Sequence, residues 1–126
     1  MKKIFEYDPM IYPRKIWVSI GASTEELNAE LEGIEDMKDS AIAVTYHTFN
    51  KNNKLGGVLI RFNKKSNITA EVAAHEATHA ALGIYEYVGA DVDVENQEPF
   101  AYLVGFITDC IWLSKNYKNK KGDKDE

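Results

Sequence analysis

The chain is poor in cysteine, in long apolar runs and in positive charge, and each shortage excludes a class of protein. The single cysteine, Cys110, excludes an intramolecular disulfide framework and the cysteine-rich ligand sets of most structural zinc sites. No apolar run approaches the roughly 20 residues that a membrane-spanning helix needs. The chain has 15 basic and 20 acidic residues, a net charge of −5, so we expect no general affinity for nucleic acid.

The remaining composition is that of an ordinary globular protein. With 126 residues, 44% of them hydrophobic and 28% charged, the chain suits one domain with one modest core. We expect this domain over residues 1–114, followed by a disordered polar tail over residues 115–126. Acidic residues and prolines at positions 6, 8, 9 and 13 interrupt the apolar stretch that a secretory signal requires. The sequence therefore predicts a cytoplasmic protein.

The hydrophobic pattern predicts a small α+β domain. Its expected elements are strands over residues 15–20, 41–49 and 55–62, and helices over residues 24–31, 68–82 and 96–114. The second and third strands are separated by a polar turn, so they form a hairpin. We expect a short, mostly antiparallel sheet that packs against the helix over residues 68–82, with the last helix beside it.

Helix boundaries are marked by specific residues. Ser23 and Glu26 have the spacing of a capping box. Asn67 and Thr69 are cap candidates for the helix over residues 68–82, and Gly83 stands where that helix is expected to end. The expected core face of the last helix consists of Leu103, Phe106, Ile107, Cys110 and Leu113.

Residues 75–79, His-Glu-Ala-Thr-His, fit the pattern H-E-x-x-H. On a helix, His75 and His79 lie on one face, and both imidazoles can reach one metal ion at roughly 2.0–2.1 Å. Glu76 lies about 100° around the helix from His75, where it can take a proton from a water that the metal activates. The alanine-rich context without proline favours the helix. The pattern predicts a hydrolytic zinc centre; the alternative is two structural histidines with a solvated Glu76.

A catalytic zinc ion usually has three protein ligands. Glu98 is the favoured third ligand, with Glu95 as the second choice and His47 on the second expected strand as a third. Pro99 fits the first turn of a helix and so places Glu98 at the helix entrance. Small residues at positions 101 and 105 continue the face of Glu98, and the motif helix is itself rich in alanine. Two such faces let the helices approach closely.

The motif followed by Glu98 on the next helix resembles the gluzincin branch of the zincin-like metallopeptidases. The segment over residues 68–111 also looks like small zincin-like proteins of phages and mobile elements. The resemblance covers roughly half of the chain. It implies a zincin-like fold, Zn²⁺ bound by His75, His79 and a downstream glutamate, and Glu76 as the general base.

The function expected from the motif is that of a zinc-dependent metallopeptidase acting on a peptide or protein substrate. Tyr102 is the favoured hydrogen-bond donor to the oxyanion that forms during hydrolysis, and His47, Tyr85 and Tyr87 are the other candidates. The strand over residues 57–62 is expected to be the edge strand that binds extended peptide.

The alternative function is a non-catalytic zincin-like module that binds a partner protein in phage or mobile-element regulation. An intact Glu76 favours the peptidase, because a binding module has no need of a base. The small size of the chain favours the module, because little chain is left to build substrate pockets.

Overall fold

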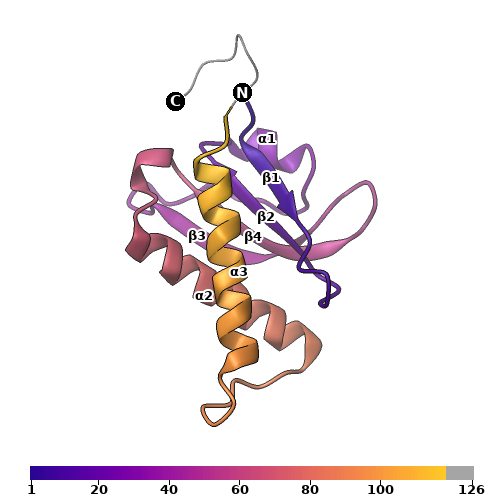
Figure 1. Cartoon of the computed structure of the whole chain (residues 1–126). Coiled ribbons are helices and arrows are strands. Elements are labelled where there is room, and N and C mark those ends of the chain that lie inside the picture. The colour runs from indigo at the N-terminus through magenta and orange to yellow at the C-terminus, as the bar shows by residue number, and fades with distance from the viewer. Residues whose placement is uncertain (119–126) are drawn as a thin grey trace.

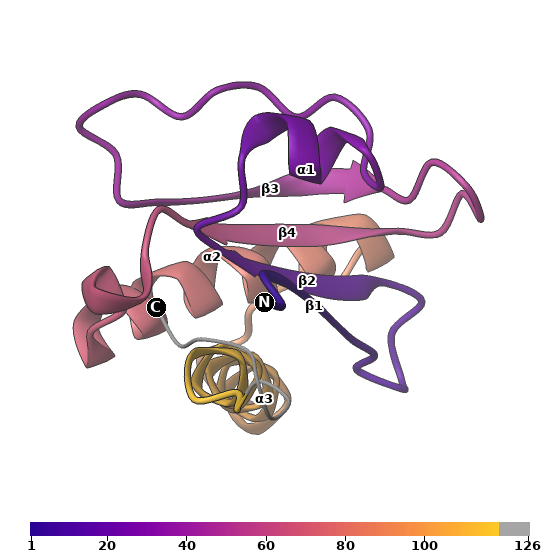
Figure 2. The same cartoon turned by 90° about the horizontal axis from the view of Figure 1, so that it is seen from above.

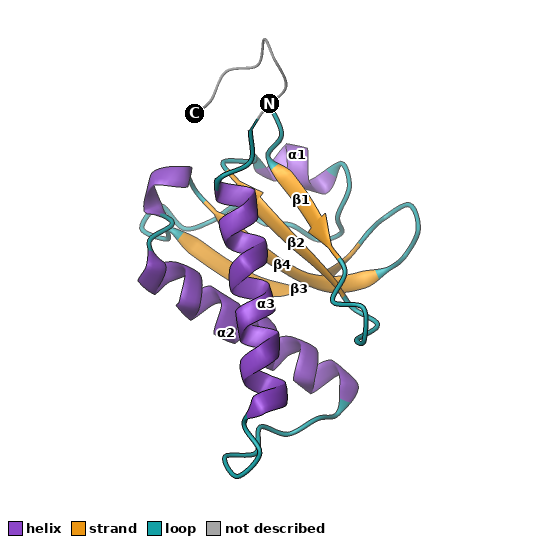
Figure 3. Ribbon diagram, in the orientation of Figure 1, coloured by secondary structure: helices purple, strands orange, loops and turns teal. Residues whose placement is uncertain are grey.

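A four-stranded mixed sheet carries two long helices on one face and a short helix on the other (Figures 1 and 2). The structure is a computed structural model that describes residues 1–118. Its elements are β1 (Ile4–Tyr7), β2 (Lys15–Ile20), α1 (Thr24–Asn28), β3 (Ala43–Phe49), β4 (Gly56–Phe62), a 3₁₀ turn (Lys65–Asn67), α2 (Ala70–Val88) and α3 (Glu98–Lys115) (Figure 3). The α+β prediction is confirmed. No helix of the described residues is long and apolar enough to cross a membrane.

The strands are ordered β1-β2-β4-β3. The hairpin of β3 and β4 is antiparallel as predicted, and so is the pair β1 and β2, but β2 and β4 run parallel, with Ile16 opposite Val58. β1 was not predicted. The expectation that residues 57–62 form an edge strand is wrong, because β4 lies between β2 and β3. Its nearly continuous burial is typical of a strand with partners on both sides.

The outer side of β3 is an edge of the sheet, and its last residues are covered. Leu31 forms an isolated bridge with Asn50, and the Glu32 amide donates to the Phe49 carbonyl. The predicted capping box of α1 is present, since Ser23 and Glu26 bond reciprocally. α1 itself ends at Asn28, three residues before the predicted position. The chain that follows α1 can therefore turn back toward the end of β3.

α2 is longer than predicted and passes through Gly83. Thr69 caps its start, as expected, by accepting from the Val72 amide at 3.2 Å. The helix ends at Gly89, which has the left-handed φ of +74° that favours glycine. Gly83 has a different role: a methyl group there would lie 3.3 Å from both the His47 ring and Val58. The glycine thus permits close packing of helix on sheet, and the prediction that it ends the helix is wrong.

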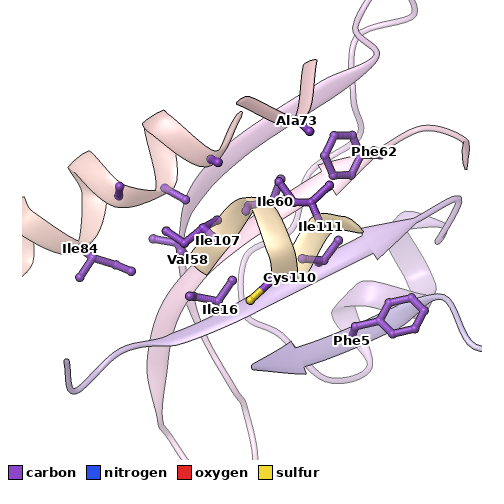
Figure 4. Packing of buried hydrophobic residues seen from close by; sticks show 14 of the residues in the cluster. Phe5, Ile16, Val58, Ile60, Phe62, Ala73, Ile84, Ile107, Cys110 and Ile111 are labelled. Atoms are coloured by element: carbon purple, nitrogen blue, oxygen red, sulfur yellow. The ribbon is translucent and has the colours of Figure 1, made fainter. Parts of the chain in front are cut away.

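The main core lies between the sheet and the helices α2 and α3 (Figure 4). Leu103, Ile107 and Cys110 are buried as predicted, and burial raises the pKa of the Cys110 thiol to about 12. Phe106 and Leu113 were predicted in the core but are 39% and 59% exposed. Their places are taken by Ile111 and Ser114, because the buried stripe follows a spacing of four rather than three residues there.

The predicted tail begins within ordered structure. Lys115 is the last residue of α3, and the Tyr117 ring lies edge-on to Phe5 with centroids 5.3 Å apart. Residues 119–126 of that predicted tail lie outside the described residues.

A second, smaller core lies on the other face of the sheet. It consists of Trp17, Ala22, Leu27, Leu31, Ile34 and Leu59. It is covered by the five-residue α1 and by the chain that follows it, so the sheet is buried on both faces but more thinly on this one.

Candidate metal centre

The two motif histidines lie side by side on the exposed face of α2. Their Nε2 atoms are 3.2 Å apart, and their ring planes are inclined by 73°. Two nitrogens bound to one tetrahedral zinc ion at about 2.0–2.1 Å would be about 3.3 Å apart. The separation of the two Nε2 atoms is thus compatible with zinc, and without a metal the two rings are within hydrogen-bond distance of each other.

Glu76 is buried, with an exposed fraction of 6%, although it neighbours an exposed histidine. Its Oε1 accepts a hydrogen bond of 2.6 Å from Thr45 Oγ1 on β3, and its Oε2 lies 4.0 Å from His75 Nε2. A buried carboxylate is costly unless it is hydrogen-bonded, and Thr45 meets that need. The alternative in which Glu76 is merely solvated does not fit this position. One carboxylate oxygen is anchored and the other faces the histidine pair.

Thr45 was not singled out in the sequence. Ala43, Thr45 and His47 alternate along β3 and face α2, whereas Tyr46 packs against the core of the opposite face. This alternation was the available signal, because it places a hydroxyl and an imidazole on the strand that runs beside the motif helix.

The structure does not gather the third ligand with the histidine pair. Glu98 begins α3 as predicted, with Pro99 in the first turn, and it is exposed. Glu95 lies in the preceding turn, where its amide donates to Asp93. Within residues 1–118, no three His, Cys, Asp or Glu side chains stand in an arrangement that could hold a metal ion. The residues present thus supply two imidazoles and a base.

His47, on β3, has other partners. Its Nδ1 lies 2.9 Å from Arg14 Nη2, and its Nε2 lies 3.4 Å from Glu86 Oε1. Because a guanidinium can only donate, Nδ1 accepts, and the ring proton of a neutral His47 is on Nε2. His47 is therefore held one helical turn beyond His79, beside Gly83.

The three tyrosines proposed as oxyanion donors lie elsewhere. Tyr102 is 74% exposed and lines a hollow of about 460 Å³ together with Pro9, Ile11, Tyr12, Pro99, Leu103 and Phe106. Tyr85 is buried against Phe100, and the Tyr87 ring lies under the Arg14 guanidinium at 4.0 Å. None of these contacts involves the motif, so the structure does not bring Tyr102 to the candidate centre.

Comparison of the chain with family models, with curated proteins and with solved structures found no match. The function is therefore inferred from the chemistry of the site: two convergent imidazoles, one anchored carboxylate and the adjoining edge strand β3.

Proposed function

We propose that this protein is a zinc-dependent metallopeptidase that hydrolyses peptide bonds, with Zn²⁺ held by His75, His79 and Glu98. Glu76 is the general base. Glu98 is the third ligand of the proposal because the resemblance implies a downstream glutamate; to join the histidine pair it has to move from its position in this structure. The alternatives at this position are Glu95 and His47.

The observation that carries the proposal is that the three motif side chains, within about one turn of α2, have different surroundings. The His75 and His79 nitrogens are 3.2 Å apart and exposed, whereas Glu76 is buried and anchored by Thr45. A structural histidine pair would not need a buried carboxylate with one oxygen turned toward it. Two histidines on one helical face with a carboxylate beside them is the arrangement that metal-assisted hydrolysis uses.

Zinc, when bound, would supply a Lewis acid that polarises the substrate carbonyl and lowers the pKa of water. Glu76 accepts the proton of the attacking water through Oε2, because Thr45 occupies Oε1. It then passes the proton to the leaving amine. Thr45 keeps the carboxylate from turning away and so acts as a positioning residue.

The substrate strand of the proposal is β3 rather than β4. β3 is the edge strand beside the motif helix, and its Thr45 reaches Glu76 directly. An extended peptide that pairs with this edge would pass the histidine pair. The expected substrate is therefore a peptide segment that can adopt an extended conformation.

The metal is tested by reconstitution with zinc followed by elemental analysis. We expect one zinc ion per chain in the wild type, and loss of zinc in His75→Ala and in His79→Ala. Failure of the wild type to bind zinc would sink the proposal. Three variants test the third ligand: Glu98→Gln, Glu95→Gln and His47→Ala. The variant with the largest loss of zinc affinity identifies the third ligand.

The second candidate function, a non-catalytic partner-binding module, is favoured by the lack of a gathered third ligand in residues 1–118. The two functions separate in a peptide-library digestion with zinc-loaded protein. Cleavage that disappears in Glu76→Gln supports the peptidase. Absence of cleavage, together with stoichiometric zinc, supports the module.

A further inference from the structure

The chain has two arginines, both buried, and they lie on opposite faces of the sheet. Arg61, on the α1 face, donates to the carbonyls of Glu35 and Ala22 and to the Thr24 hydroxyl. Arg14, on the face of α2 and α3, is 9% exposed and donates through Nη2 to the Gly57 carbonyl and to His47. Both nitrogens at the end of Arg61 are used inside the fold.

Arg14 keeps unused hydrogen-bonding capacity. Its Nε is buried and has no hydrogen-bond partner. Arg14 also takes part in none of the ion pairs among the described residues: Asp8 pairs with Lys15, and Glu86 pairs with His47. Burial lowers the pKa of Arg14, but a guanidinium stays charged in proteins. A buried cation without an anionic partner is costly, so an anion from outside the fold would relieve that cost.

A hollow of about 270 Å³ opens beside this guanidinium. It is lined by Asp8, Tyr12, Pro13, Arg14, Lys15, Leu55 and Gly56. Arg14 Nη1 approaches Gly56 so closely that a methyl group at position 56 would lie 2.3 Å from it. The glycine therefore gives the guanidinium its place at the wall of the hollow. The Tyr87 ring also packs on the guanidinium, with its centroid 4.0 Å from Arg14 Cζ.

We propose that this hollow, the Arg14 pocket, is a binding site for a single carboxylate group of a peptide. Nη1, beside Gly56, supplies the charged donor, and charged donors bind carboxylates more strongly than neutral donors do. The Nε–H is enclosed, and its resonance reports on a charge placed beside the guanidinium. Tyr12, Pro13 and Leu55 supply apolar walls for the aliphatic stem that carries the carboxylate. Asp8 limits the charge of the ligand, because a phosphate dianion would face its carboxylate across the same hollow.

The carboxylate can come from an acidic side chain or from a free C-terminus, and small probes distinguish the two. N-acetylaspartate amide carries only the side-chain carboxylate, and N-acetylglycine carries only the terminal one. N-acetylasparagine amide is the neutral control. Each is added at constant ionic strength to ¹⁵N-labelled wild-type protein, and the two arginine Nε–H resonances are followed by NMR. Arg61 is the internal control within every spectrum.

We expect a saturable shift of the Arg14 Nε–H resonance with at least one carboxylate probe, and the probe that saturates first identifies the source. Arg61 and the neutral probe should show no such change. No shift with either carboxylate overturns the proposal, and so does an equal shift of both arginines. A stronger response to inorganic phosphate overturns the assignment of the ligand as a carboxylate.

Two variants test the geometry. Gly56→Ala should displace the flexible end of Arg14 without disturbing backbone, and we expect binding at least about tenfold weaker. Arg14→Lys keeps the charge but removes Nε, so the resonance that disappears in this variant is that of Arg14. This variant should also bind the probe more weakly. Its affinity is measured from the shifts of the backbone amides that line the hollow. Unchanged affinity in both folded variants would refute the Arg14 pocket. None of these measurements needs zinc or proteolysis, so the proposal stands or falls independently of the metal centre.

Discussion

The two faces of the sheet bury similar kinds of side chain but differ in what they leave available for chemistry. On the α1 face, Arg61 donates to two carbonyls and a hydroxyl and the Trp17 indole donates to Glu6, whereas the buried Ser19 and Tyr46 hydroxyls have no hydrogen-bond partner. On the face of α2 and α3, polar groups converge with capacity left over, in the histidine pair, in Glu76 Oε2 and in Arg14 Nε. The two faces thus differ in the kind of group that lacks a full set of partners: uncharged hydroxyls on the α1 face, and ionisable side chains on the face of α2 and α3.

Among the variants that compare the two faces of the sheet, the largest expected effect is on peptide hydrolysis. Glu76→Gln keeps the size of the side chain and its bond from Thr45 but removes the base. We expect a loss of about a hundredfold to ten-thousandfold in kcat, with zinc content unchanged. Peptide hydrolysis and elemental analysis on the same samples provide the measurement. Glu6→Gln, on the other face, is the matched control and should retain full activity; equal activity in the two variants would remove Glu76 from the mechanism.

The next effect is on stability and compares the two cores. Ile107 and Leu27 are both fully buried, one under each face. Ile107→Ala leaves a cavity between long packed helices and sheet, and should cost about 4 kcal/mol; Leu27→Ala lies under a five-residue helix that can move inward, and should cost about 2 kcal/mol. Urea denaturation of both variants tests the difference. A larger cost at Leu27 would show that the thin layer is the more rigid one.

A smaller effect on stability compares a helical glycine that faces the sheet with one that faces open space. Alanine is the better helix former at both helical glycines, Gly83 and Gly105. At Gly105 a methyl group meets nothing within 4 Å, so Gly105→Ala should stabilise the protein by about 1 kcal/mol. At Gly83 the methyl group meets His47 and the fully buried Val58, and we expect Gly83→Ala to destabilise by about 1 kcal/mol. Thermal unfolding of the pair should give shifts of opposite sign; two upward shifts would contradict the close packing at Gly83.

The smallest effect concerns thiol labelling. With a pKa of about 12, the Cys110 thiol at pH 8 is ionised in about one molecule in ten thousand. Labelling of folded protein should therefore be very slow and should become rapid in denaturant. Cys110→Ala combined with Ala22→Cys moves the thiol to the thinner α1 face, where local opening should make labelling faster. Slower labelling at position 22 would reverse the assumed order of the two faces.

Local sequence signals predicted the elements that depend on local chemistry. The capping box at Ser23, the cap at Thr69, the hairpin of β3 and β4, and the start of α3 at Glu98 are all confirmed. The pairing of motif histidines also follows from helical periodicity alone, since residues four apart share a face.

Features that depend on distant partners were missed. β1 has only four residues before an Asp-Pro pair, so its pattern is too short to indicate a strand without β2 beside it. The parallel pairing of β2 with β4 is fixed by the path of the intervening chain, which no local pattern records. Gly83 was misassigned because glycine serves both helix ends and close packing, and His47 and Val58 decide between them.

The interaction of Glu76 with Thr45 shows the same limit at the site. The H-E-x-x-H pattern indicates a base and two ligands, but the hydroxyl that orients the base comes from a strand 31 positions earlier in the chain. Arg14 and its unpaired Nε could not be anticipated either, because a single arginine before a strand has no distinctive spacing.

The partial cover over the end of β3 has a consequence for self-association. Unpaired strand edges are templates on which further chains can add, and long flat ones lead to aggregation. Here the bridge of Leu31 with Asn50 and the bond from Glu32 to Phe49 close one end of the edge. The rest of the outer edge of β3, before Phe49, has no strand partner among the described residues. The cover therefore shortens the edge on which a guest strand or a second copy of β3 can add.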